Sequence, residues 1–311
     1  MSTSEQTPLP AVSVIIPTRN RPEKVRACLT ALAAQTLPSA QYEVVVVDDG
    51  SDQSLAPIIA AFANRLPVRL LEQARAGPAR ARNAGAASAR GELLAFTDDD
   101  CEPAPDWLAV LLAGHRQAPD KALGGRTVNA VDGNVYSEAS QLLVDYLYDY
   151  HARKAAPAGG PRTAAVSSAP PAFFTSNNLA VAARLFTKVG GFGASFALAA
   201  GEDREFCDRW QQHGYQLLYV PDAVVRHGHV LSLVRFWRQH ANYGHGASDL
   251  RRARVERGMP KMRIEPLSFY LGLVAYPLRR ASSRRWSLVG LMVVSQVANA
   301  TGFLTAWFRG R

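Results

Sequence analysis

Cysteine is scarce in this chain of 311 residues: only Cys28, Cys101 and Cys207 occur, and no two of them have C-x-x-C spacing. The pattern indicates neither a disulfide framework nor a zinc site, and it favours a reducing cytoplasm. The beginning of the chain also lacks a basic segment followed by an apolar run, so we expect no signal peptide there. We expect residues 1–11 to form a short disordered lead.

Motifs of nucleic-acid binding modules are missing too, although the formal net charge is +9. Much of the positive charge lies in the last third beside apolar segments, which suits an anionic membrane surface better than nucleic acid. The uncharged run 287–308 approaches the roughly 20 residues that a membrane span requires. We therefore expect 247–311 to be a basic and apolar helical region at the cytoplasmic face of a membrane. Arginines on both sides of 287–308 favour both ends staying near one face over a simple span, but the sequence leaves open whether the run spans, lies on or stays off the membrane.

Apolar runs rich in β-branched residues alternate with helical patterns from residue 12 to residue 100, which predicts an α/β fold with a mostly parallel sheet flanked by helices. Ligands of such sheets bind outside the carboxyl ends of the strands. Polar clusters follow three of the predicted strands: PTRN at 17–20, DDGSD at 48–52 and TDDD at 97–100. We expect these clusters to converge on one crevice.

The cluster TDDD contains three adjacent carboxylates, which repel one another unless a positive group lies against them. Alternation along a strand would direct Asp98 and Asp100 to one side and Asp99 to the other. Asp98 and Asp100 could then hold Mg²⁺ or Mn²⁺, which prefer carboxylate oxygens and bridge to phosphates. The alternative is a solvated turn in which Asp100 or a neighbour caps a helix that begins near Pro105.

The cluster DDGSD places Asp48 and Asp49 at a strand end before a glycine turn. A carboxylate at this position can accept hydrogen bonds from a base or from ribose hydroxyls. The alternative is a local turn, with Ser51 or Asp52 as a helix N-cap.

The segment GPARARNAG opens a predicted helix with Arg80, Arg82 and Asn83. Guanidinium groups and the amides at a helix start both attract phosphate. A solvated charged face is the common alternative, but the position between acidic strand ends favours a ligand role for Arg82.

A later helical segment, GEDREFCDRWQQHG, begins with Glu202 and Asp203. Acids there stabilise the helix dipole, and a carboxylate at a helix start can also act as a general base toward an acceptor hydroxyl. His227 and His229 follow the last predicted strand. Each is interpretable as a structural histidine, or one of them could complete a metal site.

Taken in order, these motifs resemble the inverting family 2 glycosyltransferases, which have the GT-A nucleotide-diphospho-sugar transferase fold. The resemblance covers residues 12–246 and rests on VSVIIPTRNR, VVVVDDGS, GPARARNAG, GELLAFTDDD, SNNLAV, GGFG and GEDREFCDRWQQHGYQLLYVPDAVVRH.

The resemblance implies a role for each matching position. Asp203, with Glu202 beside it, matches the catalytic-base motif, whereas Asp98 and Asp100 match the D-x-D metal motif and His227 a position near the metal. The nucleotide-sugar would contact Pro17, Arg19, Asn20, Asp49, Arg82, Asn83, Asp98, Asp99 and Asn178. Two positions depart from the family pattern: Arg19 stands where a tyrosine is frequent, and Cys101 where another acid often follows.

The implied function is transfer of a sugar from a nucleotide donor, with UDP-sugar favoured, to a saccharide or lipid-linked acceptor of the cell envelope. A loop at 155–172, rich in Ala, Pro, Gly and Ser, would be a mobile lid. A sugar-phosphate nucleotidyltransferase is an alternative, but PTRNRPEK is not the Gly-rich loop expected of one. A non-catalytic protein that binds a membrane surface or nucleic acid is the other alternative.

Overall fold

The computed structural model describes residues 9–155, 172–194, 200–260, 264–279 and 283–309. The chain divides into two compact units. The first, here called the sheet unit, comprises the residues up to Thr127 together with Thr175–Gly191 and Val220–Val225. The second, the helical unit, comprises Val128–Phe174, Phe192–Tyr219 and Arg226–Arg311.

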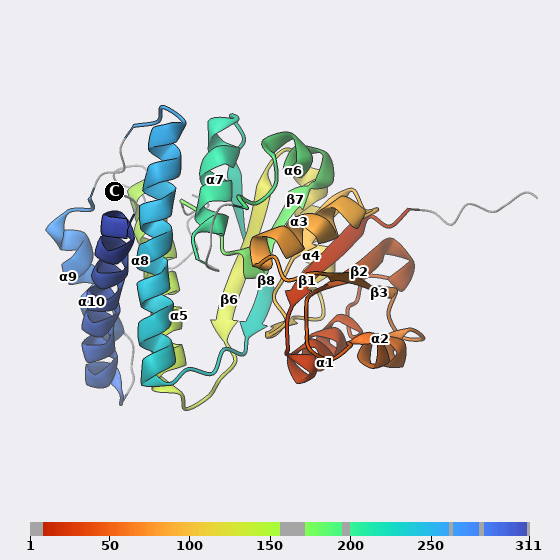
Figure 1. The fold of residues 1–311 in the computed structure, drawn as a ribbon, viewed down its shortest axis with the longest axis horizontal. Helices are drawn as coiled ribbons and strands as arrows, with labels where there is room; N and C mark the ends of the chain where they lie inside the picture. Colours follow the sequence, from red (N-terminus) through yellow and green to blue (C-terminus); the bar gives the residue numbers. More distant parts are fainter. Residues whose placement is uncertain (1–8, 156–171, 195–199, 261–263, 280–282, 310–311) are drawn as a thin grey trace, which may run out of the picture. The chain divides into compact units, whose positions relative to one another are not determined.

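The sheet unit is built on one eight-stranded sheet with the order β3-β2-β1-β4-β7-β6-β8-β5 (Figure 1). The outer parts of β6 and β8 extend into the helical unit. The strands are β1 Val12–Thr18, β2 Tyr42–Asp49, β3 Val68–Gln73, β4 Leu93–Phe96, β5 Cys101–Pro103, β6 Ala122–Asn129, β7 Leu179–Ala182 and β8 Leu217–His227.

Strands β1 to β4 are parallel neighbours, and β7 pairs antiparallel with both β4 and β6. Strands β1, β2 and β4 are buried along their whole length, as expected of strands covered on both faces. The predicted α/β fold is therefore confirmed, with an antiparallel strand inserted in the middle of the sheet.

The sheet unit contains five helices among the described residues, of which the first three connect the parallel strands β1 to β4. They are α1 Pro22–Leu32, α2 Ala56–Phe62, α3 Pro78–Ser88, α4 Trp107–Gln117 and α6 Ala183–Val189, with short 3-10 turns at Ser39–Gln41 and Ser176–Asn178. Helix α3 lies close to the sheet because Gly85 has no side chain: a Cβ there would be 2.5 Å from Ile15 and 2.9 Å from Val47.

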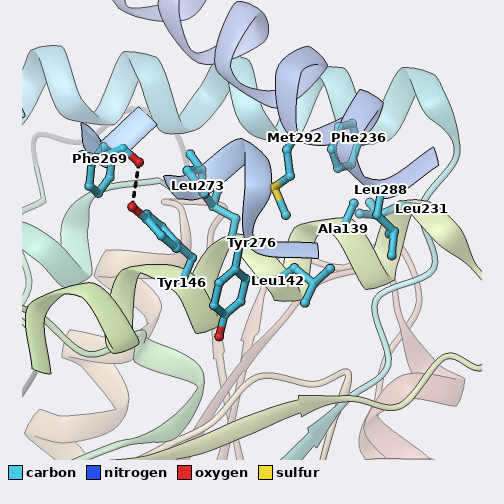
Figure 2. Close-up of a cluster of buried hydrophobic side chains, with 11 residues drawn as sticks. Ala139, Leu142, Tyr146, Leu231, Phe236, Phe269, Leu273, Tyr276, Leu288 and Met292 are labelled. Carbon is cyan, nitrogen blue, oxygen red and sulfur yellow. Dashed lines mark hydrogen bonds between the residues drawn. The ribbon is translucent and has the colours of Figure 1, made fainter. Parts of the chain in front are cut away.

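The helical unit contains α5 Val135–Ala155, α7 Glu202–Gln212, α8 Leu233–Glu256, α9 Leu267–Ala275, a 3-10 turn Tyr276–Arg279 and α10 Arg285–Arg309. Its core joins apolar side chains of α5, α8, α9 and α10 (Figure 2). In this core the hydroxyl of Tyr146 donates a hydrogen bond of 2.6 Å to the carbonyl of Phe269. Leu288 and Met292 of α10 pack into the same cluster.

One of the predicted boundaries falls within a described helix. The boundary between residues 246 and 247 falls inside α8, so the basic C-terminal region begins within a continuous helix. Residues 156–171 of the predicted lid and residues 1–8 of the predicted lead lie outside the described residues.

Candidate functional site

The three predicted polar clusters meet at the carboxyl-terminal edge of the sheet unit. Thr18 lies opposite Asp48 in the pairing of β1 with β2. The hydroxyl of Thr18 donates a hydrogen bond of 2.7 Å to Asp99, and the backbone N–H of Asn20 donates one of 2.8 Å to the hydroxyl of Ser51. The cluster after β1 is therefore bonded to both others, and the expected convergence is confirmed.

Two arginines lie against the three acids that follow β4. Arg82 of α3 donates to Asp98 at 2.6 Å. Arg21, which directly precedes α1, donates to Asp99 at 3.0 Å and to Asp100 at 3.2 Å. These guanidinium groups offset the repulsion between the carboxylates. They are the positive groups that three adjacent acids were expected to need.

Asp99 is the most deeply buried member of the triplet, with 4% of its surface exposed. Burial raises the pKa of Asp99 to about 6, and it outweighs the opposing effect of Arg21. The side chain of Asp98, in contrast, is 29% exposed. Asp98 is therefore the acid of this triplet that is most accessible to a ligand.

The structure does not support the helix-cap alternative for the triplet. Strand β5 separates the acids from α4, and the residue that precedes this helix is Asp106. Asp98 and Asp100 instead present carboxylate oxygens, the ligand type that Mg²⁺ and Mn²⁺ prefer, on a turn that also carries a third acid. Asp98 pairs with Arg82 and Asp100 with Arg21, and their joint role in holding a divalent cation stays a prediction.

The loop after β1 is fixed by its contacts with the loop after β2. Asn20 adopts a positive φ of 55°, and its side chain exchanges hydrogen bonds of 2.9 and 2.8 Å with Asp52. Arg19 donates through Nε to the carbonyl of Gly50 at 3.1 Å. The predicted nucleoside contacts thus lie together at one end of β1: Pro17 belongs to the strand, and Arg19 and Asn20 to the loop that Gly50 to Asp52 hold.

The two acids at the end of β2 hold local backbone. Asp48 accepts hydrogen bonds from the N–H and the hydroxyl of Ser51, as the turn alternative predicted. Neither Ser51 nor Asp52 caps a helix, however, because the next helix, α2, begins at Ala56 after Leu55. Asp49 accepts from the backbone N–H groups of Ala76 at 2.7 Å and Gly77 at 2.8 Å. Asp49 therefore fixes the entry into α3, the helix that carries Arg82.

Asn83 and Asn178 are both placed by the packing of the sheet unit. Gly191, with a φ of +65°, lies so close to Asn83 that a Cβ there would be 2.7 Å from the amide oxygen. Asn178 is buried, accepts from the indole of Trp107 at 2.9 Å and donates to the carbonyl of Ala223 at 2.9 Å. These bonds give Asn178 a role in joining α4 and β8 to the sheet. Its contact with the nucleotide-sugar stays a prediction.

The predicted catalytic acids belong to the helical unit, where they begin α7. Glu202 is buried, whereas Asp203 is half-buried and accepts from the backbone N–H of Arg204 at 2.7 Å. His227 and His229 lie at the end of β8 with ring centroids 5.4 Å apart. The base role of Asp203 and the metal role of His227 stay predictions.

The sequence prediction did not include Arg21, which bonds to Asp99 and Asp100 of the acidic triplet from the loop after β1. Thr18 was included only as a member of the cluster PTRN, without its bond to Asp99. One signal was available, because Arg21 follows PTRN directly and three adjacent acids need a positive partner. Residue type alone did not distinguish Arg21 from the other arginines of the chain.

Family models match most of the chain. The model described as Glycosyl transferase family 2 matches residues 13–169, and the model described as Glycosyl transferase family group 2 matches residues 98–309. Validoxylamine A glucosyltransferase from Streptomyces hygroscopicus subsp. limoneus is 30% identical over 259 residues, which are 75% of this chain and 57% of that protein. The chain spans about half the length of the curated relatives it matches.

Solved structures show the same fold at low sequence identity. A mannosyltransferase from Pyrobaculum calidifontis, in complex with GDP-Man and Mn²⁺, matches with a TM-score of 0.60 and 18% identity over 94% of this chain and 88% of that one. The structure of S. aureus TarS residues 1-349 in complex with UDP-GlcNAc matches with a TM-score of 0.51 and 18% identity, covering 96% of this chain and 92% of that one.

Proposed function

The chain belongs to glycosyl transferase family 2, and we propose that it transfers a sugar, with inversion, from a UDP-sugar to an acceptor hydroxyl. It is a glycosyltransferase with the GT-A fold. The observation that carries the proposed donor chemistry is the acidic triplet after β4, with Arg82 against Asp98. The complexes of similar folds with GDP-Man and UDP-GlcNAc support a nucleotide-sugar donor.

Asp98 and Asp100 would hold Mg²⁺ or Mn²⁺ in this proposal, with His227 as a further ligand. The Mn²⁺ in the mannosyltransferase complex supports a divalent cation. When bound, the cation would neutralise negative charge that develops on the departing nucleoside diphosphate. Arg82 supplies a second positive group beside the same carboxylate, and we assign it to the diphosphate.

The nucleoside is assigned to the loops after β1 and β2. Arg19 and Asn20 would contact it directly, since a planar guanidinium can stack on a base. Asp49 acts through its hydrogen bonds to Ala76 and Gly77, which fix the start of α3. This makes Asp49 a positioning residue for Arg82.

We assign the general base to Asp203, which would accept the proton of the acceptor hydroxyl as that oxygen attacks the anomeric carbon. The difference in burial supports Asp203 over Glu202, because Asp203 is half-buried and Glu202 is buried. A base must reach the substrate, which favours the more exposed carboxylate.

The acceptor is proposed to be a saccharide or a lipid-linked molecule of the cell envelope, used at the cytoplasmic face of a membrane. Helix α10 supports a membrane partner: it is long and apolar enough to cross a membrane, and only 28% of its most apolar stretch is buried.

Isothermal calorimetry tests the donor site. We expect UDP-sugar to bind the wild type in the presence of Mn²⁺, and we expect Asp98→Asn and Asp100→Asn to lose most of the metal-dependent affinity. Asp120→Asn is the matched control, because Asp120 is an exposed acid of the same unit that pairs with Arg184. Equal binding by all three variants, or nucleotide binding without any dependence on Mn²⁺, would refute the proposed donor site.

A further inference from the structure

Helix α10 has an exposed apolar stripe along its whole length. The stripe follows helical spacing and consists of Trp286, Val293, Val297, Leu304 and Phe308. Its two aromatic ends, Trp286 and Phe308, are each 68% exposed. From the 1.5 Å rise per residue of an α-helix, the stripe is about 33 Å long. Thr301, which is exposed between Val297 and Leu304, is a polar residue within the stripe. An exposed, mainly apolar face of this length indicates a partner.

The opposite face of α10 packs closely against α8. A Cβ at Gly302 would be 1.9 Å from the carbonyl oxygen of Ala241, and one at Gly244 would be 2.0 Å from that of Asn299. The two helices run side by side (Figure 1). This packing leaves the stripe as the side of α10 that the described residues do not cover.

Helix α9 adds a second exposed apolar face. Phe269 and Leu273 point into the core that α9 shares with α10, whereas Leu267 and Leu271 are 72% and 62% exposed. Leu278, just after α9, is exposed as well. No charged residue lies within α9.

The charged residues within 266–311 are all arginines. Residues 266–311 contain no Asp or Glu. Arg285 directly precedes Trp286 and Arg309 directly follows Phe308, and both are exposed. Arg279, at the end of the turn after α9, is exposed as well. Positive groups beside an apolar surface are complementary to a bilayer that contains anionic lipid.

We propose that α9 and α10 form a docking surface that lies in the plane of an anionic membrane, with the stripe in the boundary between headgroups and acyl chains. This inference deepens the membrane partnership of the proposed function and rests on it. Helix α8, the neighbour of α10, favours an α10 that lies in the plane of the membrane over one that spans the bilayer. Helix α8 carries exposed Arg235, Arg238, Arg252 and Glu256 beside α10, and a helix with such side chains is costly in hydrocarbon.

Vesicle sedimentation of the full chain tests the surface. We expect binding to phosphatidylcholine vesicles that contain phosphatidylglycerol, weaker binding to phosphatidylcholine alone, and release by high salt. Val297→Glu should weaken binding at least about tenfold, because it places a carboxylate in the apolar boundary. Val255→Glu is the matched control: Val255 and Val297 are each 52% exposed, and Val255 lies on α8.

Three results would overturn the inference. They are equal vesicle binding by the two variants, retention in membranes after alkaline carbonate, which indicates a span, and a wild-type dimer that Val297→Glu converts to a monomer. Calorimetry with UDP-sugar on the same proteins separates this inference from the donor proposal. If the protein binds vesicles but not UDP-sugar, only the donor proposal is refuted. If it binds UDP-sugar but not vesicles, only the proposed docking surface is refuted.

Discussion

Arg21 is the residue with the clearest predicted link between metal binding and stability. Its guanidinium contacts Asp99 and Asp100, and its side chain is 51% exposed. Removing its charge in Arg21→Gln should destabilise the metal-free protein by about 1 kcal/mol, because the repulsion among the acids is no longer offset. A bound cation supplies the missing charge, so the increase in Tm upon addition of Mn²⁺ should be larger in the variant than in the wild type.

Arg26→Gln is the control for this experiment. Arg26 lies on the adjacent helix α1, is 49% exposed and pairs with Glu23 at 3.5 Å, away from the triplet. We expect its Mn²⁺ effect to equal that of the wild type in a thermal unfolding series. The same Mn²⁺ effect in all three proteins would show that Arg21 does not share its carboxylates with the cation.

At the residue scale, the sequence predicted which residue types form the site better than it predicted which side chains pair with one another. The acids and Arg82 could be selected because their types follow strand ends. The pairing of Arg21 with both Asp99 and Asp100 could not be predicted. Strand β4 ends at Phe96, so the alternation of side chains along a strand no longer applies to the acids that follow it. The directions of these side chains depend on a turn whose geometry has no simple sequence pattern.

At the scale of elements, the apolar runs identified β1, β2 and β4 because strands buried on both faces need such runs. Strand β5, Cys101–Pro103, was missed because three residues carry no periodicity. Strand β8 continues through Pro221 as far as His227. Proline is tolerated there because the neighbour β5 is too short to pair with the whole of β8.

The contact of α8 with α10 makes a prediction about two glycines of the same helix. Gly302→Ala should destabilise the protein by about 1–3 kcal/mol, because its methyl group meets the backbone of Ala241. Gly290→Ala should stabilise it by about 0.5–1 kcal/mol, since nothing lies within 4 Å of a Cβ there and alanine favours a helix. Urea unfolding measures both, and effects of equal sign would contradict the close helix contact.

At the scale of the whole molecule, the proposed roles divide between the two units, because the acids after β4 belong to the sheet unit and Asp203 to the helical unit. Asp203→Asn should therefore lower kcat by about 10²–10⁴-fold, the usual contribution of a general base, and leave the Kd of the UDP-sugar nearly unchanged. Asp98→Asn should have the larger effect on donor binding: we expect it to raise the Kd of the UDP-sugar more than it lowers kcat. Steady-state kinetics combined with calorimetry on both variants measures this division. If Asp203→Asn lost donor affinity as strongly as Asp98→Asn, Asp203 would act in donor binding, and the base would have to be another residue.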